Sequence, residues 1–263
     1  MKTALTIAGS DPTSGAGIQA DLKVFHHFGI YGLSAVAALT AQNTCRVTAI
    51  SGVDVKLLEE QLNALISDIR PDALKTGMLL SGNSIAVVAR IVKGYDLYNL
   101  TVDPVIRSST GAMLIEEGAL DVMREELFPL ARVVTPNIYE ATALSGINII
   151  DEGDMERAAI ELKKTGAEAV IITGGHFQDG KGQGPEGKET LDLFFDGNEF
   201  HRIQGTRIKG EYHGTGCVFS AALTALMARG LSVKESAQKA REFMDIAISH
   251  ALVIGRGMRV LNI

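Results

Sequence analysis

The sequence predicts an α/β protein whose central, mostly parallel sheet is covered by helices on both faces. Two observations support this prediction. Short apolar, β-rich runs alternate with longer runs of helical periodicity along the chain, and this βαβ order is typical of a parallel sheet between helical layers. The 263 residues also contain no repeat, linker or low-complexity boundary. We therefore expect one domain, residues 1–263, with little or no separate lid.

The first half of the chain contains five pairs of a strand followed by a helix. The expected strands cover residues 4–8, 47–53, 73–76, 100–102 and 133–134, and the expected helices cover residues 18–28, 57–69, 84–92, 116–127 and 139–145. An apolar run at 33–39 indicates a further strand, whose end precedes Gln42. The first run is too short for a signal peptide and a loop of Gly, Ser, Asp and Pro follows it, so we interpret it as a buried strand.

The second half continues the pattern and then changes it. An amphipathic helix is expected over 151–165 and a compact apolar strand over 169–173, followed by an exposed, mobile glycine-rich loop over 174–188. Two strands at 191–195 and 199–203 are separated by Asp196-Gly197-Asn198, which is typical of a hairpin turn. Helices over about 215–229 and 233–252 close the chain.

Composition excludes several classes of function. The net charge is −6 and no block of consecutive lysines or arginines occurs, so nucleic acids and anionic membranes are poor partners. No run reaches the roughly 18 apolar residues of a membrane span. Cys45 and Cys217 are far apart and fit neither a metal-ligand spacing nor a disulfide framework. We expect a soluble, cytoplasmic protein.

The turn from His213 to Cys217, His-Gly-Thr-Gly-Cys, opens directly into an apolar helical segment. The first turn of a helix carries backbone N–H groups without intrahelical partners and a partial positive charge, and glycines let a phosphate approach them closely. No lysine follows the glycines, so the turn is not a Walker A loop. It is either an oxyanion cradle or an ordinary helix start capped by Thr215.

Ligands of such sheets bind beyond the carboxyl ends of the strands, and two early strand ends carry polar residues there. The loop from Gly9 to Asp21 contains Gly-Ala-Gly-Ile-Gln-Ala, but no acidic residue lies near position 40, so we interpret it as wrapping a small substrate and not a dinucleotide. Asp21 either points back at that substrate or only complements the helix dipole. Gln42 offers a donor and an acceptor to a heteroaromatic ring.

Two later strand ends offer oxygen ligands. Asp103 directly follows a strand, where it is either a Mg²⁺ ligand, direct or through water, or part of an ordinary Asp-Pro turn. Asn137 and Glu140 lie three residues apart on one helix face. They form either a capping box or a polar pair for Mg²⁺ and phosphate.

In order and spacing these motifs resemble the ribokinase-like superfamily, and within it the hydroxymethylpyrimidine and phosphomethylpyrimidine kinases of thiamine synthesis. The resemblance spans essentially the whole chain. It rests on Ala-Gly-Ser-Asp-Pro-x-x-Gly-Ala-Gly-Ile-Gln-Ala-Asp at 8–21, Gln42-Asn43, Asp103-Pro104-Val105, Thr135-Pro136-Asn137-x-x-Glu140 and the turn at 213–217, and Lys75-Thr76-Gly77-Met78 and Gly174-Gly175-His176 agree with it.

The resemblance implies a three-layer α/β/α fold and ATP-dependent phosphorylation of 4-amino-5-hydroxymethyl-2-methylpyrimidine and of its monophosphate. It implies a homodimer whose ligands are this pyrimidine, ATP and Mg²⁺. By position, the resemblance assigns the pyrimidine contacts to Gly9, Ala16, Asp21, Gln42, Met78, Val105 and His213. It assigns Mg²⁺ to Asp103 and Glu140, and the nucleotide to Asn137, Glu140 and Thr173. The backbone amides of Gly214, Thr215, Gly216 and Cys217 would stabilise the transferring γ-phosphoryl group.

Two positions invite alternatives. Cys217 stands where the sugar kinases of the superfamily usually carry an aspartate base; a helix N-terminus can lower the pKa of a thiol, so Cys217 is either a weak base or part of the pocket wall. Thr173 stands where the pyrimidine kinases commonly have lysine, and Arg107, Lys181, Lys188 or Lys209 are candidates to supply the missing charge.

Two other functions remain open at this point. One is a pyridoxal or pyridoxine kinase of the same superfamily, because its substrate is also a substituted ring with a hydroxymethyl group. The other is a non-catalytic, pyrimidine-binding homologue, which the neutral side chain of Thr173 suggests.

Overall fold

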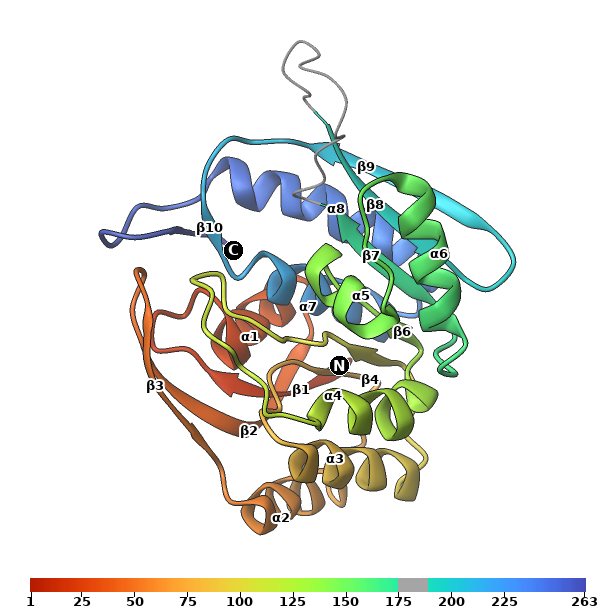
Figure 1. Cartoon of the computed structure of the whole chain (residues 1–263). Coiled ribbons are helices and arrows are strands. Elements are labelled where there is room, and N and C mark those ends of the chain that lie inside the picture. Colours follow the sequence, from red (N-terminus) through yellow and green to blue (C-terminus); the bar gives the residue numbers. More distant parts are fainter. Residues whose placement is uncertain (175–188) are drawn as a thin grey trace.

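The computed structural model describes residues 1–174 and 189–263, in which helices cover both faces of a large sheet (Figure 1). The strand order is β3-β2-β1-β4-β5-β6-β7-β8-β9. The strands are β1 (Thr3–Ser10), β2 (Tyr31–Gln42), β3 (Val47–Gly52), β4 (Ala73–Thr76), β5 (Leu100–Val102), β6 (Val133–Val134), β7 (Val170–Gly174), β8 (Glu189–Phe195) and β9 (Phe200–Thr206). Neighbours from β2 to β7 pair in parallel. The predicted α/β architecture with a mostly parallel sheet is confirmed.

Each face of the sheet packs against its own set of helices. One layer contains α1 (Gly17–His27), α7 (Thr215–Ala228) and α8 (Val233–Ser249), and the other contains α2 (Val55–Ile66), α3 (Gly82–Gly94), α4 (Ala119–Val122), α5 (Ile138–Ser145) and α6 (Glu152–Lys163). Successive strand residues point to opposite layers: Ala73 joins the first layer and Leu74 the second. The central strands β1, β4, β5, β6 and β7 are buried on both sides, which explains their continuous apolar runs.

Helix α7 is buried almost all round. Every residue from Val218 to Ala228 is buried, and the helix contacts α1, α8 and the strands β1, β4 and β5. Its sequence is accordingly apolar on every face and rich in alanine, as expected for a helix that lies between a sheet and two other helices. This burial fixes the position of its first turn, which carries the Gly-Thr-Gly-Cys motif.

Among the strands of the described residues, three neighbouring pairs are antiparallel. The pair β8 with β9 is the hairpin predicted around Asp196, and the pair β7 with β8 was not predicted. The third, β2 with β3, was not predicted. Its turn closes because the Asn43 side chain accepts hydrogen bonds from the amides of Cys45 and Arg46. A small parallel sheet of β10 (Tyr212–His213) and β11 (Arg259–Val260) also escaped the sequence pattern, because each strand has only two residues.

The other predicted elements form with ends that differ by a few residues, and one differs more. The helix expected over 116–127 begins only at Ala119, after Gly118 in a left-handed conformation (φ 76°), and becomes π-helical over Met123–Leu127, before a 3₁₀ turn at Phe128–Leu130. Most of the loop expected over 174–188, with Gly175, His176, Lys181 and Lys188, lies outside the described residues. Within them, no helix is long and apolar enough to cross a membrane.

Candidate active site

A buried ion cluster underlies the carboxyl ends of the central strands. The Lys75 ammonium at β4 lies 2.7 Å from Asp21 Oδ1 and 3.8 Å from Asp103 Oδ2, and it donates a hydrogen bond of 3.3 Å to the Cys217 carbonyl. Burial lowers the pKa of Lys75, but the neighbouring negative charges outweigh it and raise the pKa above its ordinary value. Lys75 is therefore charged and joins β4, α1, α7 and the residue after β5.

Asp21 has no exposed surface. Its carboxylate contacts Lys75 and accepts a hydrogen bond of 2.6 Å from Thr6 Oγ1. Burial raises its pKa, while Lys75 and Thr6 act in the opposite direction. The Asp21 carboxylate is thus a buried counter-ion of Lys75, and its contact with the pyrimidine stays a prediction.

Cys217 directly precedes the buried part of α7 and is itself only partly exposed. Burial raises the pKa of the thiol to about 12; Lys75 opposes this shift, and the charges of Asp103 and Asp21 add to it. The lowering expected from the helix N-terminus is therefore wrong, because burial beside two carboxylates outweighs the dipole. The raised pKa favours the neutral thiol, which supports the pocket-wall alternative.

Asp103 and Glu140 form a pair of buried carboxylates. Asp103 accepts a hydrogen bond of 2.9 Å from Ser220 Oγ, and burial raises its pKa although Lys75 opposes the shift. Glu140 accepts hydrogen bonds from the amides of Asn137 (2.9 Å) and Ile106 (3.3 Å). Burial and then the charge of Asp103 raise the pKa of Glu140 to about 8. Two carboxylates that repel each other in this way suit a divalent cation between them.

The chemistry of this donor set fits Mg²⁺. Among the described residues no group of three or more His, Cys, Asp or Glu side chains is arranged to hold a metal ion. Mg²⁺ usually keeps several waters and binds proteins through one or two carboxylates together with substrate phosphates. Asp103 and Glu140 would supply those carboxylates, and the remaining ligands would have to come from water and phosphate.

Asn137 caps α5, so the structural alternative for this motif is realised. Its Oδ1 accepts the Glu140 amide at 3.0 Å and Glu140 completes the capping box. Asn137 remains exposed. Thr173 lies beside it, since the two residues form a parallel bridge and the Thr173 amide donates to the Pro136 carbonyl at 2.9 Å. The structure therefore brings these two predicted nucleotide contacts together at the ends of β6 and β7.

The predicted walls of the pyrimidine site are neighbours. A Cβ atom on Gly9 would lie 3.0 Å from Met78 Sδ, so a backbone without a side chain rests against this methionine. Met78 and Val105 belong to one small apolar cluster; its other members are Ala38, Ile50, Leu80 and Leu114. This cluster offers a flat ring an apolar surface next to Asp103.

His213 connects three segments of the site. Its Nε2 lies 2.7 Å from Asp11 Oδ2 and 2.9 Å from Gln42 Nε2, and its Nδ1 lies 3.4 Å from Ser109 Oγ. Asp11 also accepts the Ala16 amide at 2.9 Å. Burial raises the pKa of Asp11, but the hydrogen bonds from His213 and its neighbours bring it below the ordinary value. The Asp11 carboxylate thus joins Ala16 to His213, and His213 in turn contacts Gln42, so these three predicted residues lie together.

The turn before α7 has the geometry of an anion cradle. Gly214 is the N-cap in a left-handed conformation (φ 80°) with no side-chain cap, so the alternative in which Thr215 caps the helix is wrong. The first backbone bond runs from the Val218 amide to the Gly214 carbonyl, which leaves the amides of 215–217 outside the intrahelical ladder. A Cβ on Gly216 would meet no atom within 4 Å. The space beside Gly216, in the middle of this first turn, is therefore open.

Several residues of the site were not singled out from the sequence. Lys75 was noted only as part of a motif, and Asp11, Ser109 and Ser220 were not assigned any role. A lysine inside the four-residue apolar strand at 73–76 was the available signal, because a buried lysine requires carboxylate partners. The partners of the other three residues lie more than 100 positions away along the chain, so no local pattern reveals them.

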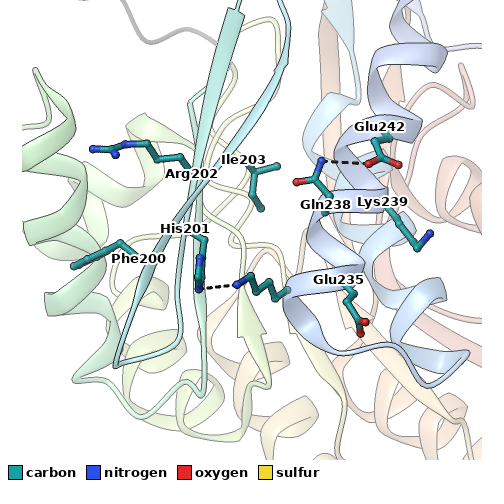
Figure 2. Close-up of a pocket in the computed structure, with 9 residues that line it drawn as sticks. Phe200, His201, Arg202, Ile203, Glu235, Gln238, Lys239 and Glu242 are labelled. Carbon is teal, nitrogen blue, oxygen red and sulfur yellow. Dashed lines mark hydrogen bonds between the residues drawn. The ribbon is translucent and has the colours of Figure 1, made fainter.

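A cavity of about 520 Å³ lies elsewhere, between β9 and α8 (Figure 2). It is lined by Phe200, His201, Arg202, Ile203, Lys234, Glu235, Gln238, Lys239 and Glu242. Phe200 pairs with Phe195, and Phe195 pairs with Val170 at the first residue of β7. The cavity is therefore near the amino end of β7. The residues described above lie at the other end of the sheet, where the parallel strands have their carboxyl ends.

The fold and the strand-end site define a phosphotransferase with the ribokinase-like fold. Residues 11–262 match the phosphomethylpyrimidine kinase family, and the chain belongs to that family.

Individual relatives agree with this assignment. The chain is 42% identical over 255 residues to the hydroxymethylpyrimidine/phosphomethylpyrimidine kinase of Bacillus subtilis, covering 97% of this chain and 92% of that protein. It is 44% identical over 259 residues to a thiamine biosynthesis bifunctional protein of Geobacter sulfurreducens, covering 98% of this chain but only 51% of that protein, so it spans about half of that relative. The structure resembles an ADP complex of Bacillus subtilis pyridoxal kinase with a TM-score of 0.88 and 35% identity, covering 99% and 96% of the two chains.

The raised pKa of Glu140 predicts how stability depends on pH without a divalent cation. The folded-state pKa of about 8 lies above the ordinary value of 4.5, so the contribution of protonated Glu140 is complete below pH 4.5 and is lost as the pH rises toward 8. The loss is about 1.4 kcal/mol per pH unit across that window. Denaturant unfolding in EDTA should show wild type losing stability relative to Glu140→Gln between pH 5 and 8. A constant difference would contradict the shift.

The neutral thiol predicts a mild effect of Cys217→Ala. Removal of a general base typically costs 10²- to 10⁴-fold in rate, whereas removal of a pocket wall should lower kcat by less than about tenfold with no change in the shape of the pH–rate profile. Steady-state ADP release at pH 6 to 9 measures both. A loss of 100-fold or more, together with the loss of one limb of the profile, would restore the base role.

Proposed function

We propose that this protein uses ATP and Mg²⁺ to phosphorylate 4-amino-5-hydroxymethyl-2-methylpyrimidine and then its monophosphate, in cytoplasmic thiamine biosynthesis. One observation carries the proposal: the first turn of α7 lies against two other parts of the site. These are the carboxylate pair and the loop after β1, which begins beside the apolar cluster of Met78. Ser220, one turn into α7, binds Asp103 at 2.9 Å, and Gly214 contacts the Gly15 backbone of the loop after β1. A ring, a cation and a transferring phosphoryl group can meet there.

Phosphoryl transfer leaves little covalent chemistry to the protein and depends on positioning and charge stabilisation. The acceptor oxygen forms a bond to the γ-phosphorus as the bond from that phosphorus to the β–γ bridging oxygen breaks. The amides of 215–217 would donate to the oxygens on which charge develops. Mg²⁺, held by Asp103 and Glu140, would neutralise further phosphate charge. In the first transfer the hydroxyl proton passes to a phosphate oxygen as the new P–O bond forms. The monophosphate acceptor of the second transfer is already ionised and needs no base, in keeping with a neutral Cys217.

Pyridoxal kinase activity is the second candidate, because a pyridoxal kinase shares this fold at 35% identity over 99% of the chain. The identity to a hydroxymethylpyrimidine/phosphomethylpyrimidine kinase is higher, at 42%, which favours the pyrimidine. We expect kcat/KM for the pyrimidine to exceed that for pyridoxal at least tenfold in parallel assays of ADP release. Faster turnover of pyridoxal would reverse the assignment, and ligand binding without ADP release would indicate a non-catalytic homologue.

We also propose a homodimer. β3 is an edge of the sheet, and most of its residues are exposed, which leaves a surface on which a second copy can pack. Light scattering should give twice the mass of one chain.

The cradle is tested by filling the space above Gly216. A Gly216→Leu side chain would enter the region facing the free amides, where a Cβ meets no protein atom, so kcat should fall at least 100-fold while the pyrimidine dissociation constant changes less than about threefold. Gly94→Leu is the matched control, because a Cβ at Gly94 in α3 also meets nothing within 4 Å. Equal losses of turnover and pyrimidine binding would show that the turn has been misassigned.

A further inference from the structure

Arg107 is an exposed cation at the rim of the site. Its guanidinium carbon lies 4.3 Å from the centre of the Tyr139 ring, and its Nε lies 3.2 Å from Met113 Sδ. Within residues 1–174 and 189–263 it forms no ion pair with a carboxylate. The side chain is thus held in place by a ring and a thioether, and its charge is not neutralised by the described protein.

The neighbours of Arg107 place it between the two halves of the site. The amide of Ile106, the preceding residue, donates to Glu140 Oε1 at 3.3 Å. Tyr139, under the guanidinium, is the second residue of α5, directly before Glu140. On the other side, Ser109 Oγ lies 3.4 Å from His213, the residue before Gly214. The segment from 106 to 109 therefore runs from the carboxylate pair to the cradle.

The other described residues that we assign to phosphate bring no free charge. The amides of 215–217, Asn137 and Thr173 carry no charge, and Lys75 is fully buried against Asp21 and Asp103. Phosphate groups of ATP and of a monophosphate acceptor bring several negative charges, which neutral donors compensate only partly. A planar guanidinium stacked on a ring is preorganised to bind phosphate oxygens with two parallel N–H donors.

We propose that Arg107 binds the phosphate oxygens of a ligand at this site, either those of the nucleotide or those of the monophosphate acceptor. The inference rests on the proposed function in naming those two sources. Stacking on Tyr139 fixes the plane of the guanidinium, and its terminal nitrogens donate to no acceptor within the described residues. Arg107 is a binding residue and takes no part in breaking or forming bonds.

The kinetic test compares Arg107→Met with Arg124→Met, which removes an equally exposed arginine from the π-helical turn after α4. Loss of a charge-assisted phosphate contact should raise one KM about 10- to 100-fold and leave the KM of the unphosphorylated pyrimidine and the melting temperature unchanged. A higher KM for ATP with both acceptors assigns Arg107 to the nucleotide. A higher KM for the monophosphate alone assigns it to the acceptor. Arg107→Lys should recover part of either loss.

A binding measurement separates this inference from the proposed function. Inorganic tripolyphosphate, titrated calorimetrically into each protein, should bind at least tenfold more weakly to Arg107→Met than to Arg124→Met. If wild type fails to phosphorylate the pyrimidine but this difference appears, the proposed function is wrong and the phosphate-binding role stands. The inference is overturned if the KM values and tripolyphosphate binding of Arg107→Met match those of Arg124→Met. It is also overturned if Arg107→Met raises every KM, including that of the unphosphorylated pyrimidine, weakens tripolyphosphate binding and lowers the melting temperature together.

Discussion

The site depends on the buried ammonium of Lys75. It contacts a carboxylate on α1, a carboxylate after β5 and a carbonyl in the first turn of α7, three segments that are distant in sequence. Burying an ion is costly unless partners compensate it, and removal of one partner from a buried pair typically costs about 3–5 kcal/mol. Because each partner belongs to a different element, the geometry that satisfies Lys75 also fixes Asp103 relative to the helix N-terminus that would receive phosphate.

Close backbone approach is the second constraint, and glycine makes it possible. A Cβ on Gly214 would lie 1.8 Å from the Gly15 carbonyl oxygen, and one on Gly17 (φ 61°) would lie 2.4 Å from the Gly9 oxygen. A side chain on Gly214 would force the loop after β1 away from α7, and one on Gly17 would force the two ends of that loop apart. Gly216 differs, since the space beside it is open. Two glycines of one motif thus have different purposes: Gly214 allows packing, and Gly216 leaves room for a ligand.

Local patterns revealed much of this arrangement, and their failures have one cause. The strand ends at Asp103 and Asn137 and the turn at Gly214 were recognisable because turn and capping chemistry is local. The pKa of Cys217 was misjudged because a helix N-terminus is visible in sequence, whereas burial beside Asp103 and Asp21 is not. The ion pair of Asp21 was missed for the same reason: the lysine that contacts its carboxylate lies 54 residues away. The antiparallel direction of β3 was missed for the same reason, because it is set by the pairing of β3 with β2.

The sequence by itself determined the α/β class, the order of its strands and helices and the residues available at the strand ends, because periodicity, capping and glycine placement act over a few residues. Only the tertiary structure decided which of those residues meet, which are buried counter-ions and which face open space. Charge state belongs to this second group: Glu140 has a pKa of about 8 because of burial and the nearby charge of Asp103, and long-range packing sets both. The Gly-Thr-Gly-Cys turn was visible in the sequence, but only the fold shows that its amides have no intrahelical partners.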